Sequence, residues 1–116
     1  MQPGLATIRG AVIAVLSLAW GQLWAAPPGA PGPDRRQEIG HLLRHECGAC
    51  HGLRLKGGLG PALTPQRLAG RPNQGLVRTI LEGREGTPMP PWRPFLAPRE
   101  ARWLVKQLKT GDWHAE

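Results

Sequence analysis

The sequence predicts a small all-α domain. Apolar residues recur at helical spacing in three stretches, and no stretch alternates apolar and polar residues as a half-buried strand does. The segments between those stretches are rich in proline and glycine, which are rare in helix interiors and in central strands. With 116 residues, the chain is long enough for one domain.

The first 26 residues have the order of a secretory signal peptide. Arg9 precedes an uncharged apolar run that ends in small residues at Ala25 and Ala26. This run is slightly short for a membrane span, so we expect a cleaved signal rather than an anchor, and a folded part outside the cytoplasm. Residues 27–33 contain only Pro, Gly and Ala and are expected to form a flexible leader.

The first helix is expected to begin at Asp34, whose carboxylate would cap it with Gln37 as the reciprocal partner. Gly40 costs about 1 kcal/mol in helix propensity relative to alanine, which is easier to understand if another helix approaches closely there. The apolar side of this helix comprises Ile39, Leu42 and Leu43, and the helix leads the chain directly into Cys47.

His41 and His45 are four residues apart on the same predicted helix and could share a metal ion. They fall on the side opposite the apolar stripe, without an acidic or thiol partner nearby. We therefore expect a solvated pair of histidines.

Helical spacing predicts three further helices, over residues 65–69, 73–82 and 98–109. Thr64 is suited to cap the first of them, and Gly83 and Gly111 to end the other two. Residues 52–60 are expected to form a glycine-rich loop, and residues 86–94 a stiff, proline-rich one. The apolar faces of the two longer helices comprise Leu76, Val77, Ile80 and Leu81, and Ala101, Leu104, Val105 and Leu108.

Cys47, Cys50 and His51 form the attachment signature of c-type haem, with two thiols three positions apart and a histidine directly after the second. The thiols would form thioethers with the haem vinyl groups, and His51 would be the proximal ligand of the iron. A disulfide between these two cysteines would close too small a loop to add much stability. A thiol–disulfide oxidoreductase would need a strand leading into the pair, and the pattern predicts none.

Met89 is the candidate for the second axial ligand of the iron. It is the only methionine besides Met1, and it lies in a loop with prolines on both sides, which lowers the entropy lost when the sulfur is fixed. A methionine that fills a core lies more often on a helix face. His114, near the C-terminus, is the competitor. If neither residue bound the iron, the open site would suit catalysis or ligand sensing rather than electron transfer.

The chain is strongly basic, with a formal net charge of +7, and all its Lys and Arg residues except Arg9 lie beyond residue 26. Export makes nucleic acid an implausible partner for this charge. A basic surface then indicates steering toward an acidic surface on a redox partner.

Residues 34–111 resemble a class I cytochrome c, in which helices pack around one covalently bound haem. Besides the attachment motif, Gly40 stands seven positions before Cys47, where the C-terminal helix crosses the first helix in that family. The resemblance implies one haem c, with its iron bound by His51 and Met89.

The resemblance also implies parts of the haem pocket. Gly60-Pro61 matches a pair whose proline carbonyl accepts a hydrogen bond from the ring of the proximal histidine, which fixes the tautomer. Trp103 matches an aromatic residue that the C-terminal helix brings to the crossing, and is expected in the haem pocket. Residues 112–116 are left as a C-terminal tail.

A narrower resemblance, over residues 46–65 and 86–92, is to the NirC-type cytochromes of denitrifying bacteria, which are periplasmic and encoded with cytochrome cd1 nitrite reductase. It implies a monomeric periplasmic electron carrier, not an enzyme, without membrane contact once the signal is cleaved. Its partner would be a haem d1 maturation dehydrogenase, from which it accepts electrons, or cytochrome cd1 nitrite reductase, to which it donates them. A general class I carrier for another periplasmic oxidoreductase is the alternative.

Overall fold

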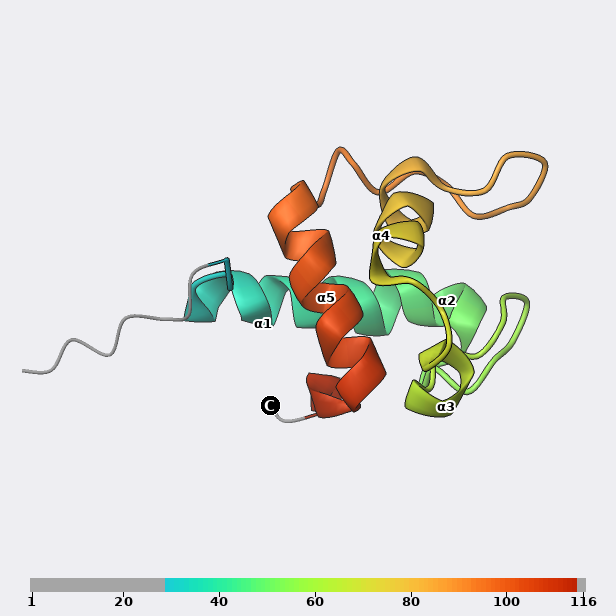
Figure 1. The fold of residues 1–116 in the computed structure, drawn as a ribbon, viewed down its shortest axis with the longest axis horizontal. Coiled ribbons are helices and arrows are strands. Elements are labelled where there is room, and N and C mark those ends of the chain that lie inside the picture. The colour runs from blue at the N-terminus through green and yellow to red at the C-terminus, as the bar shows by residue number, and fades with distance from the viewer. Residues whose placement is uncertain (1–28, 115–116) are drawn as a thin grey trace, which may run out of the picture.

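The computed structural model describes residues 29–114, and the predicted signal peptide and the first residues of the leader lie outside this range. The described residues form helices and loops without a strand, which confirms the predicted all-α class (Figure 1). The α-helices are α1 Pro33–Leu42, α2 Gly48–His51, α3 Pro65–Leu68, α4 Asn73–Glu82 and α5 Pro98–Thr110. A π-helical turn η1, Leu43–Cys47, joins α1 to α2, and a 3-10 turn η2, Asp112–His114, follows α5.

Helix α1 begins one residue earlier than predicted, and Asp34 does not cap it. Gly32 is the N-cap residue, Pro33 occupies the first turn, and no side chain hydrogen-bonds to the exposed N–H groups. Proline has the φ angle of a helix and no N–H to satisfy, so the helix can start at that residue. Asp34 therefore lies in the first turn, where its charge is favourable to the helix dipole.

The first helix also runs further than predicted, because η1 and α2 continue it as far as His51. In η1 the Gly48 N–H donates to the carbonyl of Leu43, five residues back. Such single π turns occur often at functional sites, and this one contains Cys47.

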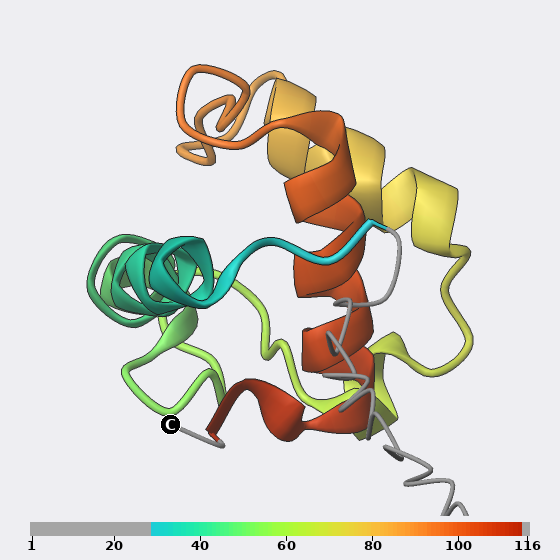
Figure 2. The same cartoon turned by 90° about the vertical axis from the view of Figure 1, so that its left-hand side faces the viewer.

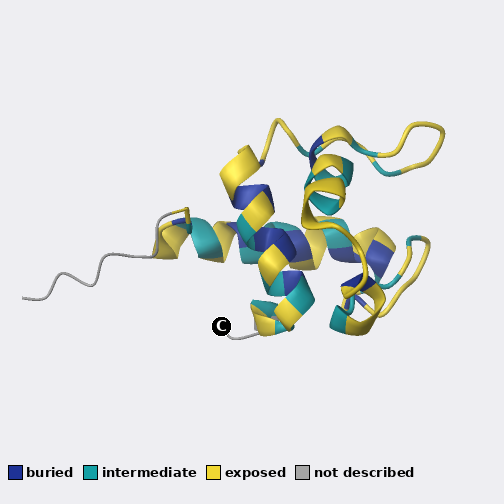
Figure 3. Cartoon of the chain, in the orientation of Figure 1, coloured by how far each residue is buried: buried dark blue, intermediate teal, exposed yellow. Residues whose placement is uncertain are grey.

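Helix α5 is the centre of the domain. It crosses the first helix and packs along α4, as Figures 1 and 2 show from two directions. The buried residues of α5 are Glu100, Ala101, Leu104, Val105 and Leu108 (Figure 3). The core cluster comprises Ile39, Leu43, Leu55, Leu68, Leu81, Leu96, Ala101, Leu104 and Leu108.

The expectation that Gly40 permits a close helix crossing is wrong. A Cβ atom added at Gly40 would meet no other atom within 4 Å. Ile39 and Leu43, two large buried side chains of the same stretch, belong to the core cluster together with Ala101 and Leu104 of α5.

An ion pair ties the start of α1 to the start of α5. Arg35 donates to both carboxylate oxygens of Glu100, over 2.9 and 3.1 Å, and to the Phe95 carbonyl over 2.6 Å. Glu100 is buried and also accepts a hydrogen bond from the Ala97 N–H at 2.8 Å. The carboxylate of Glu100 thus caps α5 and binds α1 at once.

No helix within residues 29–114 is long and apolar enough to cross a membrane.

Candidate functional site

Cys47, Cys50 and His51 lie within little more than one helical turn, at the junction of η1 and α2. Residues three and four apart share a helix face, so the two thiols and the imidazole point to one side. Cys47 is half-buried, Cys50 is exposed, and both are free thiols. All three side chains line a single cavity.

Burial raises the pKa of the Cys47 thiol to about 11, and the nearby Glu46 and Cys50 add to the rise against a backbone hydrogen bond that lowers it. Redox-active cysteines have the opposite property, a lowered pKa that makes the thiolate available. The environment of Cys47 therefore disfavours a thiol–disulfide oxidoreductase.

The loop after α2 folds back against the end of that helix. The Gly57 N–H donates to the His51 carbonyl and the Gly60 N–H donates to the Cys50 carbonyl, each over 2.8 Å. This places Gly60 flat against the imidazole, where an added Cβ would lie only 2.8 Å from both Cε1 and Nδ1 of His51. Only a residue without a side chain fits between this loop and the ring.

The next residue in this loop, Pro61, determines which nitrogen of His51 is free. The ring Nδ1 lies 2.7 Å from the Pro61 carbonyl oxygen. A carbonyl oxygen only accepts, so Nδ1 must carry the proton and donate. Nε2 then keeps its lone pair, which is the form of histidine that binds a metal ion.

Met89 lies in the loop between α4 and α5, lines the same cavity and is half-buried there. The cavity has a volume of about 460 Å³, which is in the range of small-molecule and cofactor sites. Its apolar lining comprises Leu43, Leu59, Ala62, Leu63, Leu68, Leu76, Ile80, Trp92, Leu104, Val105 and Leu108.

These residues fit a covalently attached haem. The cavity combines two thiols, an imidazole with a free Nε2, a thioether and a mainly apolar wall. Thioether and imidazole are ligands that suit haem iron, and an apolar wall suits the macrocycle. Of the residues predicted for the site, the structure brings together Cys47, Cys50, His51, Gly60, Pro61 and Met89.

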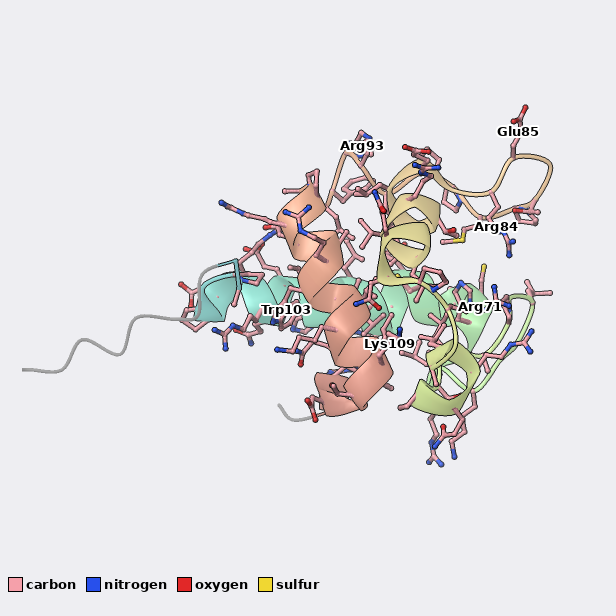
Figure 4. All side chains as sticks on the ribbon, viewed as in Figure 1. Arg71, Arg84, Glu85, Arg93, Trp103 and Lys109 are labelled. Carbon is pink, nitrogen blue, oxygen red and sulfur yellow. The ribbon has the colours of Figure 1, made fainter. Side chains whose placement is uncertain are left out.

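Trp103 is the exception, because it is not among the described residues that line the cavity. The side of α5 that faces the cavity carries Leu104, Val105 and Leu108. At about 100° per residue, Trp103 lies roughly on the other side of the helix. It packs partly buried against the core cluster, beside the crossing with α1 (Figure 4). The structure thus places Trp103 beside the helix crossing and not in the lining of the cavity, where it was expected.

The predicted pair of histidines lies away from this centre. His41 and His45 are both exposed, with their rings stacked at a centroid distance of 5.9 Å, and neither lines the cavity. They are a solvent-facing pair, as predicted. His114 is the last residue of η2, after the end of α5.

Sequence reasoning missed three arginines that line the cavity, Arg67, Arg71 and Arg84. All three are exposed, and their side chains make no hydrogen bond or ion pair with the rest of residues 29–114. Figure 4 shows Arg71 and Arg84 on the same side of the molecule. Arg67 and Arg71 are close in the sequence, but only the fold brings them to the same cavity as Arg84, so the spacing of the three carries no signal.

Comparisons with known proteins agree with this site. The family model described as cytochrome C oxidase, cbb3-type, subunit III matches residues 34–107. Cytochrome c55X of Pseudomonas aeruginosa is 49% identical over 109 residues, which are 90% of this chain and 92% of that protein. Cytochrome c55X of Stutzerimonas stutzeri is 48% identical over 82 residues, covering 71% of this chain and 73% of the relative.

Two solved structures extend the comparison. The c-type cytochrome NirC has 53% sequence identity and a TM-score of 0.70, covering 72% of this chain and 98% of NirC. Dihydro-heme d1 dehydrogenase NirN, in complex with DHE, has 36% identity and a TM-score of 0.55 over 60% of this chain, but only 15% of NirN. The cavity with its two thiols, its oriented histidine and its methionine, together with these similarities, shows that the chain belongs to the class I c-type cytochromes, electron carriers with covalently bound haem c, in the group of cytochrome c55X and NirC.

Proposed function

We propose that this chain is a periplasmic one-electron carrier of the nitrite reductase system, and that it accepts the electrons released when haem d1 is completed by dehydrogenation. The observation that carries the electron-transfer part is the single cavity lined by Cys47, Cys50, His51 and Met89. The partner is supported by the likeness to NirC and to a segment of NirN.

In this proposal each residue of the cavity has a distinct task. Cys47 and Cys50 hold the haem through thioethers, and the haem, once bound, supplies an iron that gains and loses one electron. His51 offers Nε2 as the proximal ligand, and the Pro61 carbonyl keeps its ring oriented by accepting from Nδ1. Met89 offers its sulfur as the distal ligand.

Two features of the site favour a carrier over an enzyme or a gas sensor. If His51 and Met89 both bound the iron, no position on it would be left for a substrate. The apolar wall also excludes water, so that the surroundings reorganise little when the charge of the centre changes. An open distal site would instead leave Met89 without a role.

The rim of the cavity supports an acidic protein partner. Arg67, Arg71 and Arg84 are exposed and unpaired within the described residues, and Leu59, which lines the same cavity, is 93% exposed. Unpaired positive charge around an exposed apolar side chain suits brief contact with an acidic surface that has an apolar centre. Such contact is fast and weakens with salt.

The resemblance to NirN favours the acceptor role. That neighbour is named as a dehydrogenase of dihydro-heme d1, and the segment similar to this chain is 15% of it. A dehydrogenation releases two electrons and two protons, so two molecules of a one-electron carrier are reduced one after the other and the protons pass to solvent. A small carrier with a related fold can receive these electrons.

We further propose that residues 1–26 are the signal peptide, 27–33 the leader, 34–111 the cytochrome domain and 112–116 a tail, in a monomeric carrier.

Stopped-flow reduction tests this proposal. The oxidised holoprotein is mixed with the purified dehydrogenase and dihydro-haem d1, and in a parallel arm the reduced holoprotein is mixed with purified cytochrome cd1 nitrite reductase and nitrite. Rapid reduction in the first arm supports the acceptor role, and rapid oxidation in the second alone would make the chain a donor. Absence of reaction in both arms would leave a carrier for another oxidoreductase.

The charge of the rim is tested in the same instrument at low and high salt. The triple variant Arg67→Gln, Arg71→Gln, Arg84→Gln should react more slowly and lose most of its salt dependence. The matched control removes three arginines that are also exposed but do not line the cavity, Arg78, Arg99 and Arg102. If both triple variants were slowed equally relative to wild type, the net charge of the protein would matter and the position of the arginines at the rim would not.

A further inference from the structure

The loop that carries Met89 is closed by hydrogen bonds on both sides of the methionine. The Arg84 N–H donates to the Met89 carbonyl over 3.2 Å. The Thr87 hydroxyl donates to the Arg84 carbonyl over 2.7 Å and accepts from the Met89 N–H over 3.4 Å. One hydroxyl therefore links the beginning of the loop to the backbone of Met89.

The far end of the loop is tied to helix α4. The Trp92 N–H donates to the Ile80 carbonyl over 3.0 Å, and the Arg93 N–H donates to the Leu81 carbonyl over 3.2 Å. These bonds use carbonyls that the end of α4 would otherwise leave unpaired. They return the chain after Met89 to the helix from which it departed.

Gly83 is the point where the two ends of this loop touch. It ends α4 with a φ of +70°, and a Cβ added there would lie 2.6 Å from the Met89 carbonyl oxygen. The same Cβ would lie 2.7 Å from the carbonyl carbon of Pro90 and 2.9 Å from the nitrogen of Pro91. All three are backbone atoms, so no side-chain rotation relieves the contact, and the prolines leave the backbone little freedom to move.

We propose that Gly83 and Thr87 are positioning residues that hold the Met89 backbone against the end of α4 and thereby keep its sulfur at the cavity. This inference rests on the proposed role of Met89 as the distal ligand. Gly83 does not line the cavity, whereas Thr87 does, and the Thr87 hydroxyl also accepts a hydrogen bond from the Met89 backbone. They favour the state in which the Met89 sulfur binds the haem iron over the state in which it is unbound.

The test uses the holoprotein and two signals that report methionine ligation directly. One is the thioether-to-iron charge-transfer band of the oxidised protein, and the other is the fraction of the reduced protein that binds carbon monoxide. Gly83→Ala should lose most of the band and bind carbon monoxide readily. The matched control is Gly86→Ala, because Gly86 has a similar φ of +74° but no atom within 4 Å of an added Cβ.

Thr87 is tested by a second pair of variants. Thr87→Val removes the hydroxyl at nearly constant shape and should shift the methionine equilibrium about fivefold toward the unbound form, the effect of one ordinary hydrogen bond. Thr87→Ser, which keeps a hydroxyl, should restore it. Thr110→Val is the control, because the Thr110 hydroxyl makes the same kind of local bonds, to the Lys106 carbonyl and from the Asp112 N–H, at the far end of α5.

Several results would overturn the inference. A Gly83→Ala protein with an unchanged band and no carbon monoxide binding would do so, and so would equal losses in Gly83→Ala and Gly86→Ala. If Gly83→Ala does not fold, the Thr87 variants decide, and a Thr87→Val protein identical to wild type contradicts the proposal. Met89→Ala distinguishes failure of this inference from failure of the proposed function. If this variant leaves both signals unchanged, Met89 is not the ligand, and the proposed function requires a different distal ligand.

Discussion

Replacing Glu100 by alanine should lower the free energy of unfolding by about 2 kcal/mol, because one buried carboxylate caps α5 and binds α1. Loss of the hydrogen bond to the Ala97 N–H costs about 1 kcal/mol, as for other N-terminal caps. The pair with Arg35 contributes about 1 kcal/mol more, well below the value of a fully buried pair, because the Arg35 side chain is 38% exposed and water screens it.

Glu100→Gln separates the two contributions. The glutamine side chain keeps an oxygen that can accept from the Ala97 N–H but has no charge for Arg35. We therefore expect this variant to lose about 1 kcal/mol, half the effect of alanine. Glu82→Ala is the control, since Glu82 and its partner Arg93 form a surface pair 55% exposed on both sides. That variant should change stability by less than about 0.5 kcal/mol.

The pH dependence of the same pair has a definite sign. The hydrogen bond from Arg35 holds the pKa of Glu100 below its usual 4.5, with help from the Ala97 N–H and against the effect of burial. A carboxylate with a lowered folded-state pKa stabilises the protein above its unfolded-state pKa and loses that contribution as the pH falls through the folded-state value. The stability advantage of wild type over Glu100→Gln should therefore shrink below about pH 4.5.

The assay is urea unfolding of the holoprotein, followed by far-ultraviolet circular dichroism at neutral and acid pH. Equal midpoints for Glu100→Ala and Glu82→Ala would refute the reasoning, since they would show that the buried pair is worth no more than a surface pair. An advantage over Glu100→Gln that grows on acidification would show that the assigned direction of the pKa change is wrong.

Three further predictions concern single positions. Gly60→Ala should press on the His51 ring and cost about 1–3 kcal/mol in urea unfolding while altering the haem absorption spectrum, whereas Gly70→Ala, with open space around an added Cβ, should leave the spectrum unchanged. Gly40→Ala should raise the free energy of unfolding by up to about 1 kcal/mol, because the helix gains propensity and the new methyl group meets nothing; a clear loss would mean that the helices approach more closely there. Leu59→Ser should leave the urea midpoint unchanged, since the side chain is 93% exposed, but slow the stopped-flow reaction with the redox partner; an unchanged rate would exclude Leu59 from the contact surface.

Features that depend on neighbouring residues were predictable from the sequence. Thr64 caps α3 by accepting from the Arg67 N–H, and Gly111 ends α5 in a left-handed conformation, because both effects act within a few residues of the chain. The haem attachment signature is of the same kind. Its thiols and imidazole share a helix face through their spacing alone, whatever the rest of the chain does.

Two of the predictions that failed concern contacts between distant segments. Gly40 was expected to admit a second helix, but the distance between two helices depends on all the side chains between them, including Ile39 and Leu43. Trp103 was expected in the pocket, but the rotation of α5 about its axis is set by the burial of Leu104 and Leu108. Asp34 was a local failure, where the proline before it started the helix one residue earlier.

The sequence by itself determined the chemistry available to this protein: two thiols, a histidine and a methionine in a stiff loop, within an all-α chain. Only the tertiary structure decided how these groups are held. It set the Pro61 carbonyl against Nδ1 of His51, packed the Met89 backbone onto Gly83, and gathered Arg67, Arg71 and Arg84 around one cavity. The physical reason is that bonding capacity belongs to a residue and its near neighbours, whereas distance and burial depend on the packing of the whole chain.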